Sequence, residues 1–188
     1  MAQRPTFLRR LISPAVSRGH AFARDDRGVT AIEFGILALP FFTLIAATLE
    51  TTLVFLAGQV LDSAVEDASR MIKTGQMQSP ANDMADFRDY LCDYTFNLFD
   101  CSKIRIQVRE ITNFSSTSLG SSPTTCTTNT CDLTMAEDYD PGSNRDVIQV
   151  RAYYRWPLMV NLPYFNMKNQ PDSYRLLGAT RVFRNEPF

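Results

Sequence analysis

Glu33 is the residue whose type and position most clearly imply chemistry. It is the only charged residue in the first half of a long apolar segment, and it lies five residues after Gly28. Burying an ionised carboxylate at the edge of a membrane is costly unless a partner neutralises it, so such an acid is a functional candidate. A cut after Gly28 would free the α-ammonium group of Val29, which can neutralise Glu33 of a neighbouring copy. If the chain is cut there, the spacing allows an ion pair between copies.

The four cysteines form the second group with possible chemistry, and all of them follow the apolar segment. Their spacing suggests two local disulfides, Cys92 with Cys101 and Cys126 with Cys131, although four cysteines allow three pairings. Each short loop would stabilise the fold by about 2 to 3 kcal/mol in the chain-entropy model. A zinc site made of four cysteines is the alternative, but the closely spaced cysteine pairs of most zinc sites are missing.

Catalytic side chains are sparse in this sequence. The only histidine, His20, precedes Gly28, so a chain cut after Gly28 would contain no imidazole. No glycine-rich phosphate loop, GxSxG or CxxC motif occurs. Adjacent acids, such as Glu66 with Asp67 and Glu137 with Asp138, are typical of solvated surface charge. We therefore expect a protein that is not an enzyme and has no cofactor, metal or small-molecule substrate.

The apolar segment that contains Glu33 predicts a membrane helix. Residues 29–61 exceed the roughly 20 residues that cross a bilayer. We expect one helix over 29–74, spanning the membrane over about 29–57, with its end marked by Lys73 and Gly75. Its second half repeats apolar residues at three- and four-residue steps, at Val54, Ala57, Leu61, Ala64, Val65, Ala68, Met71 and Ile72.

Pro40 lies inside this predicted helix, where it removes one backbone hydrogen bond. One interpretation is a tolerated membrane proline, which is common. The other is a functional kink that lets the helix leave the bilayer and pack against other subunits. The sequence favours neither.

Charge is distributed unevenly along the chain. Residues 1–28 contain six arginines and two aspartates, whereas the remainder carries 13 basic and 18 acidic side chains. The positive-inside rule predicts a cytoplasmic leader over 1–28 and a distal part that crosses the membrane. Because the basic charge lies in the leader, we expect no nucleic-acid partner. Asp25, Asp26 and the length of the apolar segment argue against a transit peptide and an ordinary secretory signal.

Gly28, Val29, Glu33 and Phe34, followed by GILALPFFTLIAATL, resemble the cleavage and assembly signature of type IV prepilins. The version GVTAIEF, in a chain of this size, is similar to the TadE-like pseudopilins of the tight-adherence (Flp) pilus. The closing RVFRNEPF fits that family as well. The resemblance implies a prepilin peptidase that cuts between Gly28 and Val29, with other pseudopilins and the pilus assembly machinery as partners. It also implies the bacterial inner membrane as location, with a cytoplasmic N-terminus and a periplasmic C-terminal domain, and incorporation into the pilus as the alternative location.

Residues 75–188 predict an α+β domain, in which the long helix and a second helix pack on a small antiparallel sheet. The second helix is expected near 80–99, with Ser79 as its cap and Pro80 in its first turn. Alternating residues predict three strands, over 104–111, 147–156 and 174–184. The Ser/Thr-rich segment 112–130 is expected to be an exposed loop, and 157–171 a proline-punctuated connection.

The expected function is that of a minor pilin or pseudopilin. The resemblance implies that the major Flp pilins consist of little more than a leader and one hydrophobic helix, whereas some 110 residues follow the helix here. The alternative is a signal-anchored periplasmic binding or sensory domain that is never cleaved, and a secreted enzyme is a more distant one. In the binding domain, the aromatic residues of one strand, Tyr153, Tyr154 and Trp156, would form a ligand face. Otherwise these rings pack in the core or belong to a protein contact patch.

Overall fold

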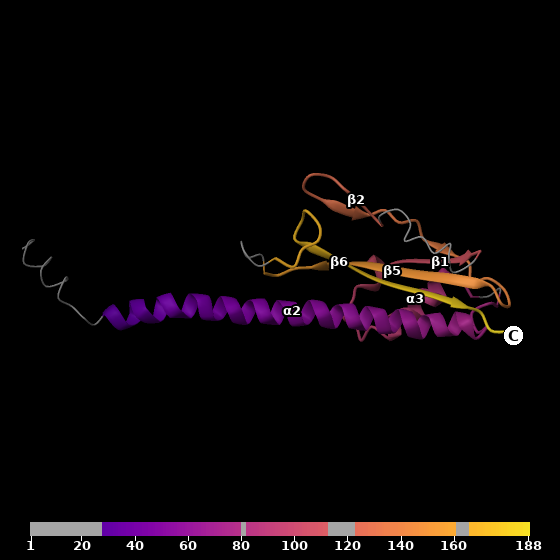
Figure 1. Ribbon diagram of the computed structural model, residues 1–188, viewed down its shortest axis with the longest axis horizontal. Coiled ribbons are helices and arrows are strands. Elements are labelled where there is room, and N and C mark those ends of the chain that lie inside the picture. The colour runs from indigo at the N-terminus through magenta and orange to yellow at the C-terminus, as the bar shows by residue number, and fades with distance from the viewer. Residues whose placement is uncertain (1–27, 80–81, 113–122, 161–165) are drawn as a thin grey trace, which may run out of the picture. The chain divides into compact units, whose positions relative to one another are not determined.

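The computed structural model describes residues 28–79, 82–112, 123–160 and 166–188 of the 188-residue chain. Most of the predicted leader lies outside these residues. The chain divides into two compact units, residues 1–45 and 46–188, which are described separately. One helix, α2 (Val29–Lys73), contributes to both units. The long N-terminal helix, the second helix and the sheet confirm the predicted α+β class (Figure 1).

The part of α2 within residues 46–188 is amphipathic. Its buried positions recur at the three- and four-residue steps of one helical face, at Glu50, Val54, Ala57, Leu61, Ala64, Val65, Ala68, Ser69 and Ile72. The predicted apolar stripe is therefore confirmed, except that Met71 is only partly buried. This stripe packs with α3 and the sheet into one hydrophobic core.

The end of α2 is held by the C-terminal segment of the chain. Gly75 adopts a φ of +80°, and the N–H groups of Gly75 and Gln76 donate to the carbonyls of Ile72 and Met71, both at 3.0 Å. This pattern is a Schellman cap. The ring of Phe188 lies so close that a Cβ on Gly75 would meet it at 2.6 Å. The predicted stop at Gly75 is thus confirmed, and Phe188 covers it.

The second helix is shorter than the sequence predicts. Helix α3 spans Met84–Asp93, and its cap is Asp83 rather than Ser79. Asp83 Oδ1 accepts from the N–H of Asp86, whose own carboxylate accepts from the N–H of Asp83, which makes a capping box. At the other end, Phe96 and Asn97 adopt left-handed φ values of 53° and 56°, which no continuing α-helix can contain. Pro80 lies outside the described residues.

Four strands form the main sheet, in the order β4-β1-β5-β6. Strand β5 (Val147–Pro157) pairs antiparallel with β1 (Arg105–Ile111) on one side and with β6 (Tyr174–Arg184) on the other. The three alternating runs therefore form the predicted antiparallel strands. The fourth strand, β4 (Asp138–Tyr139), pairs parallel to β1, so the sheet is mixed rather than three-stranded and antiparallel.

The predicted loop over 112–130 contains a strand. Strand β2 (Thr124–Cys126) forms a two-stranded antiparallel sheet with β3 (Cys131–Leu133). Threonine favours strands as a β-branched residue, and the direct pairing of Cys126 with Cys131 places their sulfurs for a disulfide. The loop prediction was therefore wrong for residues 124–126, and residues 113–122 lie outside the described part.

A charged contact fixes β6 along α2. The guanidinium Nη2 of Arg181 donates to Asp62 at 2.7 Å and to Glu66 at 3.1 Å. The hydrogen bond to Asp62 is the main reason that the pKa of Arg181 is raised. At the end of α2, the N–H of Glu186 donates to the carbonyl of Lys73 at 2.9 Å. Strand β6 and the C-terminal segment therefore follow α2 in the same direction.

Candidate functional site

The predicted cleavage junction lies at the beginning of α2. Gly28 is exposed and directly precedes Val29, the first residue of the helix. A Cβ added at Gly28 would meet no atom within 4 Å. The surroundings of this peptide bond therefore impose no local requirement for glycine.

Glu33 and Phe34 follow within the next turn, and both side chains are exposed on the helix surface. Residues four apart on a helix share a face, so Glu33 lies one turn along from the nitrogen of Val29. The first turn of α2 contains no acidic residue. Glu33 therefore provides the first negative charge after the junction.

The helix around Glu33 is apolar on all sides. Its large side chains are exposed in every direction, at Val29, Ile32, Phe34, Ile36, Leu37, Leu39, Phe41, Phe42 and Leu44. A helix that is hydrophobic all round requires an apolar environment. Within the described residues, α2 is the one helix whose length and composition suit a membrane span. This finding is compatible with membrane anchoring.

Three threonine hydroxyls of α2 are bonded within the helix. The hydroxyls of Thr43, Thr51 and Thr52 donate to the carbonyls four residues earlier, at 2.8, 2.8 and 2.9 Å. Because no water is available inside a bilayer, polar groups there must form their hydrogen bonds within the protein. The α-helical assignment of α2 continues through Pro40. Whether Pro40 kinks the helix remains a sequence-based prediction.

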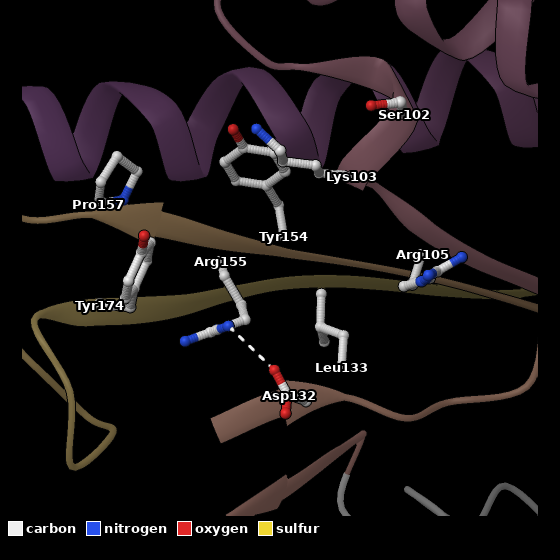
Figure 2. Close-up of a pocket in the computed structure, with 9 residues that line it drawn as sticks. All are labelled: Ser102, Lys103, Arg105, Asp132, Leu133, Tyr154, Arg155, Pro157 and Tyr174. Atoms are coloured by element: carbon white, nitrogen blue, oxygen red, sulfur yellow. Dashed lines mark ion pairs between the residues drawn. The ribbon is translucent and has the colours of Figure 1, made fainter. Parts of the chain in front are cut away.

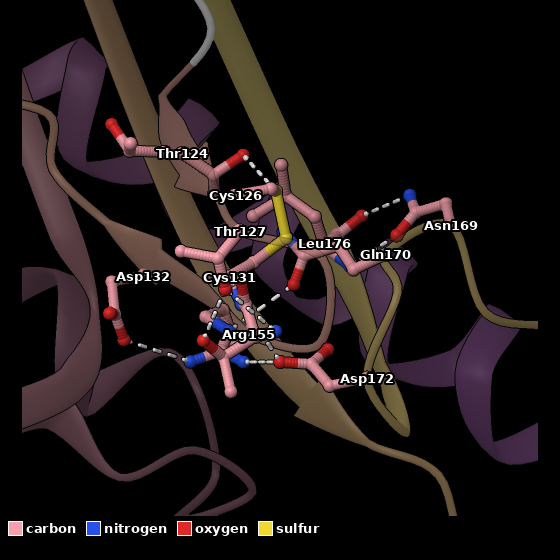
Figure 3. The surroundings of a disulfide bond; sticks show 12 residues. Thr124, Cys126, Thr127, Cys131, Asp132, Arg155, Asn169, Gln170, Asp172 and Leu176 are labelled. Carbon is pink, nitrogen blue, oxygen red and sulfur yellow. Dashed lines mark hydrogen bonds and ion pairs between the residues drawn. A yellow bond between two sulfur atoms is a disulfide. The ribbon is translucent and has the colours of Figure 1, made fainter.

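The four cysteines form the two local disulfides that the spacing suggests, Cys92–Cys101 and Cys126–Cys131. The first joins α3 to the short 3₁₀ helix η2 (Cys101–Lys103), which precedes β1. The second closes the β2–β3 hairpin (Figure 3). All four cysteines are therefore paired in disulfides.

The hairpin is joined to the β5–β6 end of the sheet by polar contacts. The N–H of Cys131 donates to Asp172 Oδ2 at 3.2 Å, and the same carboxylate forms an ion pair with Arg155 (Figure 3). Arg155 also lies 3.8 Å from Asp132 and stacks over the ring of Tyr174, 4.4 Å from its centroid. Arg155 thus joins the hairpin to this end of the sheet. The sequence analysis did not identify this role, because the partners of Arg155 are distant in sequence.

A hollow of about 410 Å³ lies beside Arg155 (Figure 2). It is lined by Ser102, Lys103, Arg105, Asp132, Leu133, Tyr154, Arg155, Pro157 and Tyr174. Its cations already have acidic partners, since Lys103 lies 2.7 Å from Asp100 and Arg105 lies 3.5 Å from Glu137. The hydrogen bond from Lys103 lowers the pKa of Asp100. The hollow therefore contains paired charges, which is typical of structural ion pairs.

The three aromatic residues of β5 serve mainly in packing. Tyr154 is buried and contacts Phe99 edge-on, with ring centroids 4.9 Å apart, and Trp156 packs on the same Phe99 ring. Tyr153 lies over Gly178 of β6, where a Cβ would meet its ring at 2.7 Å. These three rings therefore pack in the core and on the sheet, as one of the two interpretations from the sequence predicts.

Glu50 is the acid in the apolar run whose role the sequence reasoning did not assign. Its side chain is 4% exposed, and Oε1 accepts from the backbone N–H of Met159 at 3.1 Å. An acid within an apolar run can be recognised in the sequence. Its hydrogen-bond partner cannot, because Met159 lies 109 residues away in sequence.

Comparison with known proteins gives one match. The model of the TadE-like protein family matches residues 28–70, which contain the predicted cleavage junction, Glu33 and most of α2. No match was found among curated proteins or solved structures. Residues 28–70 are therefore similar to the TadE-like family, in agreement with the resemblance that GVTAIEF indicates.

Proposed function

We propose that the chain is a minor pilin or pseudopilin of a tight-adherence pilus, anchored in the inner membrane by α2, with its distal domain in the periplasm. A prepilin peptidase cuts between Gly28 and Val29. The mature protein has no enzymatic activity and acts through contacts with other pseudopilins and the assembly machinery.

The observation that carries this proposal is the order of features at the start of α2. An exposed glycine precedes an apolar helix, and an exposed acid follows one turn into it, all within the segment that matches the TadE-like family. An acid in this position requires a cation in a lipid environment. Cleavage creates that cation at Val29.

The charge created at Val29 and the carboxylate of Glu33 would pair between neighbouring subunits. Such a pair aligns two helices in register, because only one axial offset brings the charges together. In a water-excluded setting, removing one partner leaves the other uncompensated, which costs about 3 to 5 kcal/mol. The pair therefore favours association of cleaved subunits over uncleaved ones.

A minor role agrees with the size of the distal domain. Residues 46–188 form a compact unit with its own hydrophobic core. A domain of this size suits a position at the tip or base of a pilus better than repeated use along a thin fibre.

The test is the intact mass and N-terminal sequence of the protein extracted from membranes of cells with and without their prepilin peptidase. The expected result is a terminus at Val29 that depends on the peptidase. A matched pair of variants sharpens the test. Gly28→Ala adds one methyl group in an unobstructed position, and Gly58→Ala makes the same change within α2, also in open space. Only Gly28→Ala should impair processing.

The alternative of an uncleaved binding or sensory domain predicts a chain that still begins at Met1 in both strains. The hollow beside Arg155 would then be the first place to look for a ligand. A peptidase-dependent terminus at Val29 rejects this alternative.

A further inference from the structure

The connection between β5 and β6 returns to α2 at one defined place. The backbone N–H of Met159 donates to Glu50 at 3.1 Å, and the hydroxyl of Thr51 lies 3.9 Å from the sulfur of Met167. Both helix residues belong to the first turns of α2 inside the unit 46–188. The Pro157–Tyr174 end of the sheet therefore lies beside the Ala46 end of this unit's helix.

At this end of the sheet, apolar side chains are exposed and an acidic side chain is buried, which is the reverse of the usual arrangement on a water-facing surface. Met159 is 79% exposed, and four apolar side chains of the helix are exposed as well, whereas Glu50 among them is only 4% exposed. We call these five exposed residues the apolar collar: Leu49, Leu53, Phe55, Leu56 and Met159. The acid turns into the protein, where a backbone N–H satisfies it, and the apolar groups turn outward.

Aromatic and cationic side chains accompany the collar. Lys168 is exposed next to Met167, and Arg175 donates to the carbonyl of Met167 at 2.6 Å. Tyr174 is also exposed, and the neighbouring Asp172 is neutralised by Arg155. Apolar groups accompanied by tyrosine and by long cations are typical of the boundary between lipid tails and headgroups.

The length of α2 agrees with such a placement. Leu49 follows Val29 by 20 residues in the sequence, and Leu56 follows it by 27. About 20 apolar residues, with a range of roughly 17 to 25, cross a bilayer. The collar residues of the helix therefore come one membrane span after Val29 in the sequence.

We propose that the apolar collar, including Met159 of the β5–β6 connection, inserts into the periplasmic leaflet, so that the distal domain is seated on the lipid surface rather than held above it on a stalk. This inference rests on the proposed membrane anchoring. The hydrogen bond from Met159 lets Glu50 enter the interface without exposing a carboxylate to lipid, and Lys168 and Arg175 meet the phosphate groups.

The test places a fluorescent probe at position 159 of the full chain. All four native cysteines are consumed in disulfides, so Met159→Cys provides a single reactive thiol for an NBD label. Because the Met159 side chain is exposed, the label should not disturb the core. The matched control is Asn144→Cys, which is exposed before the other end of β5, an 11-residue strand of about 36 Å at roughly 3.3 Å per residue.

Both labelled proteins are reconstituted into vesicles of phosphatidylethanolamine and phosphatidylglycerol, with and without nitroxide-bearing lipid in both leaflets. We expect the probe at 159 to be quenched several-fold more by the nitroxide lipid than the probe at 144. A Leu56→Cys variant should behave like position 159 and provides a second reading from the helix itself.

Equal quenching at 159 and 144, in protein that floats with the vesicles, would overturn the seating on the lipid surface and leave the proposed anchoring intact. Protein that does not float with the vesicles would overturn the anchoring, and this inference with it.

Discussion

The carboxylate of Glu50 accepts a hydrogen bond from the backbone N–H of Met159 across 109 residues of sequence. This contact joins the long helix to the connection between the last two strands. Because Glu50 is buried, this hydrogen bond satisfies a carboxylate that is largely withdrawn from water.

Replacing Glu50 with alanine should destabilise the distal domain by about 1 to 3 kcal/mol, because the hydrogen bond between the Glu50 carboxylate and the N–H of Met159 is lost. Glu50→Gln keeps an acceptor oxygen and should cost less. Thermal unfolding of the full chain in detergent, followed by circular dichroism, measures both. The control is Asp89→Ala, which removes an exposed acid from α3 and should change stability little. Equal losses for Glu50→Ala and Asp89→Ala would contradict this role of Glu50.

Gly75→Ala should destabilise the protein for two separable reasons. The left-handed φ of +80° costs a residue with a Cβ about 1 to 2 kcal/mol, and that Cβ would also meet the ring of Phe188 at 2.6 Å. Introducing Gly75→Ala into a Phe188→Ala background removes the clash and leaves the backbone strain. The loss of unfolding free energy should therefore be smaller in that background. An equal loss in both backgrounds would show that the ring yields without cost.

The stability of the distal domain should fall as the pH rises above 10. Burial raises the pKa of Tyr139 from 10.0 to about 12, and its hydroxyl donates to the carbonyl of Met77 at 3.2 Å. Between these pH values the unfolded chain loses the phenolic proton and the folded chain keeps it, so folding becomes less favourable. Unfolding by denaturant at pH 9 and pH 11 measures the effect. Tyr139→Phe should remove this part of the pH dependence, and an unchanged slope in that variant would assign it to other groups.

Most of the secondary structure could be predicted because it leaves a periodic pattern. Strands β1, β5 and β6 come from runs in which apolar and polar residues alternate, and the second half of α2 repeats at three and four. In β1 burial alternates as well, whereas in β5 the residues from Ile148 to Ala152 are all buried, which the alternation does not predict. Strand β4 has only two residues, too few for any period, and its pairing with β1 is decided by the tertiary fold. The Ser/Thr-rich composition likewise concealed the β2–β3 hairpin.

The functional residues divide in the same way. Gly28, Val29 and Glu33 are recognisable because their chemistry depends on spacing along one segment. Glu50 and Arg155 depend on partners brought near by the fold, Met159 in one case and Asp172 in the other. No local pattern encodes such distant pairs, so sequence reasoning could note Glu50 in the apolar run without assigning its role.

The two disulfides should contribute unequally to stability. Cys92–Cys101 joins α3 to η2, and both residues pack against the main core, whereas Cys126–Cys131 closes a separate two-stranded hairpin. Replacing the first pair with serine should therefore lower the melting temperature more than replacing the second. The chain-entropy model alone would give about 2 to 3 kcal/mol for each. Equal losses would mean that loop closure dominates over the packing at Cys92 and Cys101.

Glu33→Ala should leave the distal domain folded and weaken pilus assembly. Glu33 is exposed, belongs to the unit 1–45 and is not among the residues of the hydrophobic core, so its removal has no reason to change the melting temperature. The expected loss arises between subunits, where the α-ammonium group of Val29 would remain without its counter-charge at a cost of about 3 to 5 kcal/mol. Counting pili by electron microscopy and measuring the melting temperature of the extracted protein separate the two effects. Glu33→Gln keeps the size of the side chain and removes the charge, so it should resemble Glu33→Ala. Wild-type numbers of pili with Glu33→Gln would show that the carboxylate charge is not what aligns the subunits.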